Sequence, residues 1–163
     1  MSADCVNHVG QWQSLGFEER LKTTDKELSL AAEIGYNSIR IILEYAVWRE
    51  HDTFYQRFDR YLDICKKHDI SCMVVLADDC MPPKSPVWKR PATGEQSYDV
   101  GYHGGRKESQ HGIFPGMGPH FWLDDPMHEE CYYTMIKELV TRHRDDERIL
   151  IWDVYNEPGN SKL

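Results

Sequence analysis

The residues with the clearest chemical potential are Asn156 and Glu157, which follow an apolar run close to the end of the sequence. That run, residues 149–155, has the composition of a buried strand, and Pro158 ends it directly after the Asn–Glu pair. An amide and a carboxyl group are therefore expected at the carboxyl end of a parallel strand. The pattern places one carboxyl group at the mouth of a sheet, and a second one would have to come from later strands.

Three apolar runs are predicted to form the strands that position this pair. They cover residues 37–43, 71–77 and 149–155, and the first two are nearly continuous in Ile, Val, Leu and Met. Such runs are expected when both faces of a parallel sheet are covered. A further strand would have to precede Asp4.

Amphipathic patterns between these runs predict three helices. The first has a capping box with Thr24 as N-cap and Glu27 reaching back, and it ends at Gly35. Its predicted inward residues are Leu28, Ala31, Ala32 and Ile34. The second helix turns one face inward, formed by Phe54, Phe58, Tyr61, Leu62 and Cys65. The third begins at Asp125-Pro126 and ends near His143, with Tyr132, Met135, Ile136, Leu139 and Val140 inward. This alternation predicts parallel α/β units with right-handed crossovers.

The length of the chain limits the fold that these units can form. An eight-stranded α/β barrel needs about 250 residues, whereas this chain has 163. The prediction is therefore an α/β fold that forms a partial barrel, or half TIM barrel. A loop from Asp78 to Asp124, after the third barrel strand, is long enough to be either functional or disordered.

Composition narrows the class of partner and the cellular compartment. A net charge of −8 argues against nucleic acid and anionic membranes, and no apolar run approaches the roughly 20 residues of a membrane span. Five cysteines without a C-x-x-C pair fit a reducing compartment, and residues 1–5 show no secretion signal. A cytoplasmic location is therefore favoured over a secreted one.

In ordered combination, three segments resemble the amino-terminal half of a cellulase-type glycoside hydrolase, from the family 5-like retaining clan of (β/α)8 enzymes. Residues 28–40 resemble the helix and second strand of that family, residues 74–79 its third strand and residues 152–158 its fourth. On this resemblance, residues 1–163 are one incomplete hydrolase domain.

The resemblance implies roles for three residues. Glu157 would be the general acid/base, Asn156 would hydrogen-bond the 2-hydroxyl of a sugar, and Arg40 would support the site electrostatically. The nucleophile would be a glutamate on the seventh strand, which this chain does not contain, so the isolated chain is expected to be inactive. Many relatives have a histidine at the end of the third strand, where this chain has Asp78 and Asp79.

Retaining hydrolysis needs two carboxyl groups about 5 Å apart, one as nucleophile and one as proton donor. The donor must keep its proton near neutral pH, which burial or a nearby negative charge achieves. The apolar run before Glu157 predicts that its carboxyl group is desolvated in this way.

Aromatic side chains could bind the faces of sugar rings. Trp88 and Trp122 are the preferred candidates, with Asp79 and His103 added as polar contacts. The other rings expected on the same side are Trp48, Tyr98 and Tyr102. The alternative for all of these rings is that they pack the loop onto the barrel rim.

Several of these residues also have structural interpretations. Arg40 could form an ion pair with Asp153 or Glu44, and Asp153 is expected to be a hydrogen-bond partner inside the barrel. The loop histidines have no metal-ligand spacing, so neither a metal nor another cofactor is predicted.

The function expected of the complete protein is hydrolysis of β-linked poly- or oligosaccharides, and the sequence favours none of glucan, mannan or xylan. The alternatives are a non-catalytic carbohydrate-binding module and a half-barrel that assembles with a missing half or a second copy. Unpaired strands at the edges of the sheet favour such assembly.

Overall fold

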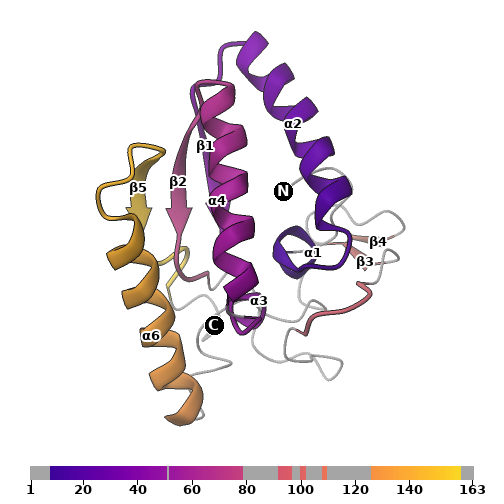
Figure 1. Cartoon of the computed structure of the whole chain (residues 1–163). Coiled ribbons are helices and arrows are strands. Elements are labelled where there is room, and N and C mark those ends of the chain that lie inside the picture. The colour runs from indigo at the N-terminus through magenta and orange to yellow at the C-terminus, as the bar shows by residue number, and fades with distance from the viewer. Residues whose placement is uncertain are drawn as a thin grey trace.

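The structure is a computed structural model that describes residues 8–50, 52–78, 92–96, 100–101, 108–109 and 126–158. Its centre is a three-stranded parallel sheet (Figure 1) formed by β1 (Ser38–Ile42), β2 (Ser71–Val75) and β5 (Ile149–Asp153). The strands lie in the order β1-β2-β5, each beside the strand that precedes it in this sheet. The three predicted strands and the α/β class are confirmed, with each strand slightly shorter than expected.

The pairing between β2 and β5 contains one irregularity. Cys72 pairs with Ile149, but Met73 pairs with Ile151, so Leu150 forms a bulge in β5. Because side chains alternate along a strand, this extra residue decides which side chains of β5 face the helices. Beyond the bulge, Trp152 shares the helix-facing side with Val74, and Asp153 faces the other side.

Arg40 lies on the same face of the sheet as Asp153. It pairs with Met73 in β2, and β1 and β2 are in regular register from Ser38↔Ser71 to Ile42↔Val75. The middle of β1 and the end of β5 therefore present charged side chains on the face opposite the helices.

The helices α2 (Phe17–Glu33), α4 (Asp52–Lys67) and α6 (Pro126–His143) lie on one side of the sheet in Figure 1. The helix α4 connects β1 to β2, and α6 connects β2 to β5. Two crossovers of the same hand between successive neighbouring strands place their helices on the same face. Two shorter helices, α1 (His8–Trp12) and α3 (Tyr45–Trp48), were not predicted.

The predicted long loop contains two short strands that pair in parallel. They are β3 (Val100–Gly101) and β4 (Glu108–Ser109). The segment predicted as a long loop therefore includes a short pair of strands.

The hydrophobic core fills the space between the sheet and the helices. It confirms the predicted inner face of α4, where Phe54, Phe58, Tyr61, Leu62 and Cys65 are all buried. From α6 it takes Tyr132, Met135 and Leu139, and from the sheet Ile41, Cys72 and Val74. The predicted N-cap of α6, Asp125, lies outside the described residues.

The start of α2 corrects the prediction from the sequence. The helix begins at Phe17, after Gly16 in the left-handed region with φ 71°, and Thr24 is a buried residue in its interior. Thr24 cannot be the N-cap because its backbone is already helical. The buried face formed by Phe17, Leu21, Thr24 and Leu28 extends the helix by two turns ahead of the apparent capping box.

The carboxyl end of α2 confirms the role of Gly35. Its φ is 96°, and the N–H of Tyr36 bonds to the carbonyl of Ala31 while the N–H of Gly35 bonds to that of Ala32, both at 3.0 Å. These two bonds form a Schellman motif, which favours glycine at this position. Ile34, expected to be inward, is instead 76% exposed.

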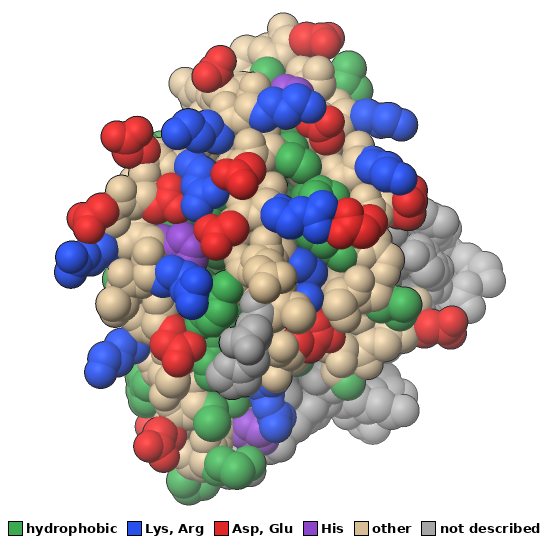
Figure 2. Space-filling model, viewed as in Figure 1, with side chains coloured by type: hydrophobic (Ala, Val, Ile, Leu, Met, Phe, Trp, Pro, Cys, Tyr) green, Lys and Arg blue, Asp and Glu red, His purple; other side chains and the backbone are tan. Residues whose placement is uncertain are grey.

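The outer surface of the helices is covered by interspersed positive and negative side chains (Figure 2). Ion pairs such as Arg60–Glu18 and Lys67–Asp25 link α4 to α2 across this surface. Among the described helices, none has the length and apolar composition that crossing a bilayer requires.

Phe58 is fully buried, stacks on Phe54 and contacts the edges of Trp12 and His143. Phe58→Ala should lower the free energy of unfolding by about 3–5 kcal/mol because it leaves a cavity among these rings. Urea denaturation measures the loss, and Leu30→Ala on the exposed side of α2 is the control, with little change expected. Equal effects of the two changes would contradict this description of the core.

Candidate functional site

Polar side chains gather where the three parallel strands end. Arg40 comes from β1, Asp78 follows β2, and Asp153 and Asn156 lie at and just beyond the end of β5. Strand pairing continues past the strands themselves, since Asp78 and Asn156 form a parallel bridge and the N–H of Asn156 bonds to the carbonyl of Ala77 at 2.8 Å. This extension brings residues that are far apart in the sequence to one edge of the sheet.

Arg40 connects β1 to β5 across the middle strand. Its Nε donates to Asp153 Oδ2 at 3.0 Å, and its Nη2 bonds to the same carboxylate and to Asn156 Oδ1, the latter at 2.8 Å. The predicted ion pair with Asp153 is therefore present. The alternative partner, Glu44, accepts instead from the backbone N–H of Ala46.

The side-chain amide of Asn156 is held at both ends. Its Oδ1 accepts from Arg40, and its Nδ2 donates to Asp78 Oδ1 at 2.6 Å. A guanidinium can only donate and a carboxylate accepts, so these two partners fix the orientation of the amide. The NH2 group carries one further hydrogen besides the one directed at Asp78.

Glu157 follows Asn156 at the same edge of the sheet. Its side chain is exposed, which corrects the expectation that the preceding apolar run would bury it. The bridge at Asn156 is the last sheet contact among the described residues, and Glu157 and Pro158 after it are both exposed. Glu157 has φ 49°, in the left-handed region that non-glycine residues adopt at a cost.

Glu44 is a buried carboxyl group that the sequence did not suggest as part of the chemistry. It is 1% exposed and acts as N-cap of α3: its Oε1 accepts from the N–H of Ala46 at 3.2 Å. Within the part of the chain that the structure describes, its Oε2 has no hydrogen-bond partner. Burial, with a smaller contribution from the charge of Asp78, raises the pKa of Glu44 to about 8. The only sequence signal is a single acid between two apolar segments, Ile39–Leu43 and Tyr45–Trp48.

Buried aromatic residues lie beneath this edge of the sheet. Trp48 is buried and its Nε1 donates to the hydroxyl of Tyr55 at 2.8 Å, so it cannot be an exposed platform for a sugar ring. Tyr132 donates to the carbonyl of Leu76 at 2.7 Å, and Tyr45 contacts His128 Nδ1 at 3.1 Å. These buried rings pack near the strand ends.

Of the predicted site residues, the structure brings Arg40 and Asn156 into contact, and Glu157 directly follows Asn156 in the chain. The other predicted substrate contacts lie outside the described residues, namely Asp79, Trp88, His103 and Trp122. The same holds for Tyr98 and Tyr102.

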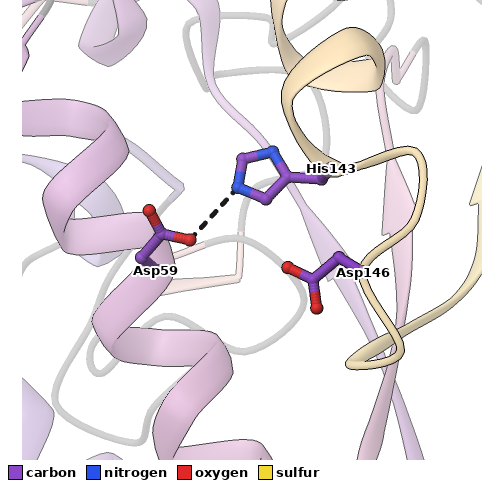
Figure 3. A group of neighbouring side chains, drawn as sticks. All are labelled: Asp59, His143 and Asp146. Atoms are coloured by element: carbon purple, nitrogen blue, oxygen red, sulfur yellow. Dashed lines mark hydrogen bonds and ion pairs between the residues drawn. The ribbon is translucent and has the colours of Figure 1, made fainter.

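A second polar cluster joins α4 to the turn before β5. Figure 3 shows His143 directed at Asp59, with Asp146 close by, and the nearest ligand atoms of the three lie within 4.8 Å of one another. Arg148 Nη2 contacts Asp59 at 2.9 Å and Asp146 at 2.6 Å, and its hydrogen bonds lower the pKa of Asp146. A metal ion would compete with this guanidinium, so the arrangement is best explained as a structural ion-pair network.

No model of a known family, no curated protein and no solved structure matches this chain.

The backbone of Glu157 gives a direct test of the local geometry. Glycine adopts the left-handed region freely whereas alanine does not, so Glu157→Gly should be more stable than Glu157→Ala by about 1 kcal/mol. Chemical denaturation of the two variants measures the difference. The reverse order of stabilities would show that residue 157 does not have a left-handed backbone.

Proposed function

We propose that this chain is part of a retaining, cellulase-type glycoside hydrolase that cleaves β-linked poly- or oligosaccharides. Glu157 would be the general acid/base, and Asn156 would donate a hydrogen bond to the 2-hydroxyl of the sugar. The observation that carries the proposal is the fixed amide of Asn156, held between Arg40 and Asp78 directly before Glu157. A donor whose direction is fixed in advance costs little ordering when a ligand binds.

The arrangement of the sheet supports a barrel rather than an open doubly wound fold. Successive strands are neighbours in the order β1-β2-β5, and the crossover helices lie on one face (Figure 1). Doubly wound sheets instead have helices on both faces and reverse the strand order at the ligand site. A half TIM barrel, with the site at the carboxyl ends of the strands, is the architecture we propose.

The backbone strain at Glu157 also favours a functional role. A non-glycine residue in the left-handed region costs about 1–2 kcal/mol, and such residues cluster at active sites. Because a glycine would remove this cost, the presence of a carboxyl side chain here is better explained by chemistry than by stability.

Retaining hydrolysis requires a nucleophilic carboxylate about 5 Å from the acid/base. The resemblance assigns that nucleophile to a seventh strand, and the parallel sheet of the described residues has three strands. We therefore propose that the 163-residue chain has negligible activity by itself, and that a carboxylate outside it completes the reaction.

Turnover of aryl β-glycosides tests this proposal. We expect no turnover from the isolated chain. In the complete protein, Glu157→Gln should lower turnover by at least about 10²-fold, because it removes the acid/base. Glu33→Gln, at an exposed position on α2, is the matched control. Activity of the complete product that does not depend on Glu157 would refute the assignment.

Assembly of two half-barrels is a second candidate function, favoured by the exposed side chains of β5 and the segment after it. Leu150, Ile151 and Val154 are all exposed, with Val154 at 70%. The carbonyl of Ile42 at the end of β1 accepts from Trp12 Nε1 at 2.7 Å, so α1 covers part of the opposite edge. Within the described part of the chain β5 pairs with β2 alone, and an edge strand with apolar side chains favours pairing with a second copy.

If this assembly forms, light scattering should give the mass of a dimer, and Ile151→Lys should give a monomer because it places a charge at the edge that pairs. Tyr133→Lys, at an exposed position on α6, should leave the dimer intact. A monomeric wild-type chain would exclude assembly without affecting the assignment of Glu157.

A further inference from the structure

We propose that His143 and Asp59 form a pH-sensitive latch: the ring of His143, protonated on both nitrogens, connects the end of α6 to α4, and loss of the proton on Nε2 breaks this connection. The latch lies beside the turn that leads into β5, whereas the candidate site lies where the strands end. The inference does not rest on the proposed function, and its test needs no substrate.

The partners of the two ring nitrogens decide where the hydrogens are. His143 Nδ1 lies 3.0 Å from the carbonyl oxygen of Leu139, and Nε2 lies 3.2 Å from Asp59 Oδ1. A carbonyl oxygen can only accept, so Nδ1 must carry a hydrogen. In a neutral ring Nε2 would then present a lone pair to Asp59. A hydrogen bond at this contact therefore needs one more proton, either on the ring or on the carboxyl group.

The other contacts of Asp59 place that proton on the ring. Asp59 Oδ1 also accepts from Arg148 Nη2 at 2.9 Å, and the backbone carbonyl of Asp59 accepts from Arg148 Nη1 at 3.2 Å. A guanidinium beside a carboxyl group favours its ionised form. Asp59 is therefore the carboxylate and His143 the imidazolium, with one N–H directed at each of its two acceptors.

The surroundings of His143 make its charge depend on Asp59. The side chain is 3% exposed, and the ring of Phe58 packs almost perpendicular to it with 5.1 Å between the ring centroids. A buried cation is costly unless it is paired. His143 is the last residue of α6, where the helix dipole also favours positive charge. Without the carboxylate of Asp59, the neutral ring would gain in stability relative to the charged one.

Charged groups reach the ring from α4 and from the turn before β5. Asp59 belongs to α4 and Asp146 to the turn, and the nearest ligand atoms of these two aspartates and of His143 lie within 4.8 Å of one another (Figure 3). Arg148 would repel the ring, but it bonds to both aspartates and to Asp63 Oδ1 at 2.6 Å. Its hydrogen bonds lower the pKa of Asp146, with a smaller contribution from the charge of His143. Two neighbouring cations have other partners: Arg142 lies over the ring of Tyr55, and Arg144 pairs with Asp145.

The latch acts on the start of β5. The N–H of Cys72 bonds to the carbonyl of Arg148 at 2.9 Å, and the N–H of Ile149 bonds to that of Asp146 at 3.0 Å. When Nε2 loses its proton, its lone pair faces the carboxylate of Asp59. Asp59 then moves away from the ring, which disturbs its bonds to Arg148 and so the pairing of β2 with β5. The stabilisation is therefore present where the ring is charged and is lost as pH rises through its titration.

Nitrogen NMR of the histidine rings in the full chain, followed as pH is raised, tests the latch. We expect both nitrogens of His143 to carry hydrogen at the acidic end, and Nε2 to lose its hydrogen while Nδ1 keeps it. The amide signals of Cys72 and Ile149 should shift with the same midpoint. In Asp59→Asn, whose amide can donate to an uncharged Nε2, the midpoint for His143 should move to lower pH. The internal control is His68, which contacts Asp25 at 2.6 Å and should titrate alike in both proteins.

Equal midpoints for His143 in the wild type and in Asp59→Asn would overturn the proposal, as would loss of the hydrogen from Nδ1 first. A ring titration that leaves the amides of Cys72 and Ile149 unchanged would also overturn it. If Asp59→Asn does not fold, His143→Gln decides, because its amide can donate to Asp59 but does not titrate. The pH-dependent shifts of the two amides should disappear in this variant, and their persistence would refute the latch.

Discussion

The candidate site depends on the hydrogen bonds and the ion pair that Arg40 forms across the sheet. One guanidinium on β1 contacts both Asp153 and Asn156, which belong to β5 and the segment after it. Because β2 lies between the two strands, these contacts can form only when all three strands are in register. The orientation of the Asn156 amide, and with it the start of the turn that presents Glu157, therefore reports on the assembly of the whole sheet.

Much of the fold could be predicted because it follows from local patterns. The continuous apolar runs gave the three strands, and the stripe on α4 gave its buried face, since burial imposes the periodicity directly. Other features depend on partners far along the chain. The bulge at Leu150 is set by pairing with β2, and the start of α2 by a buried face that overrides the local capping pattern at Thr24.

The site was predicted in part for the same reason. The pattern placed Asn156 and Glu157 at a strand end, and charge complementarity offered Asp153 as one of two partners for Arg40. The resemblance, not a pattern, singled out Arg40 itself. The sequence did not identify Glu44 as a buried acid, and it placed Trp48 on the surface. Both depend on α3, a short helix that turns these side chains inward and has no clear signal of its own.

The charge distribution at the strand ends bears on the kind of ligand that the site can accept. Arg40 and Asp153 form an ion pair, and the buried carboxyl group of Asp78 lies beside Asn156 at the same strand ends. The carboxyl group of Asp78 already accepts a hydrogen bond from Asn156, and a negative charge on it would repel an anionic ligand. Glu157, the residue after Asn156, adds a second carboxyl group. On the proposed function, a neutral sugar bound by its hydroxyls would fit this arrangement better than a uronate or a phosphorylated sugar would.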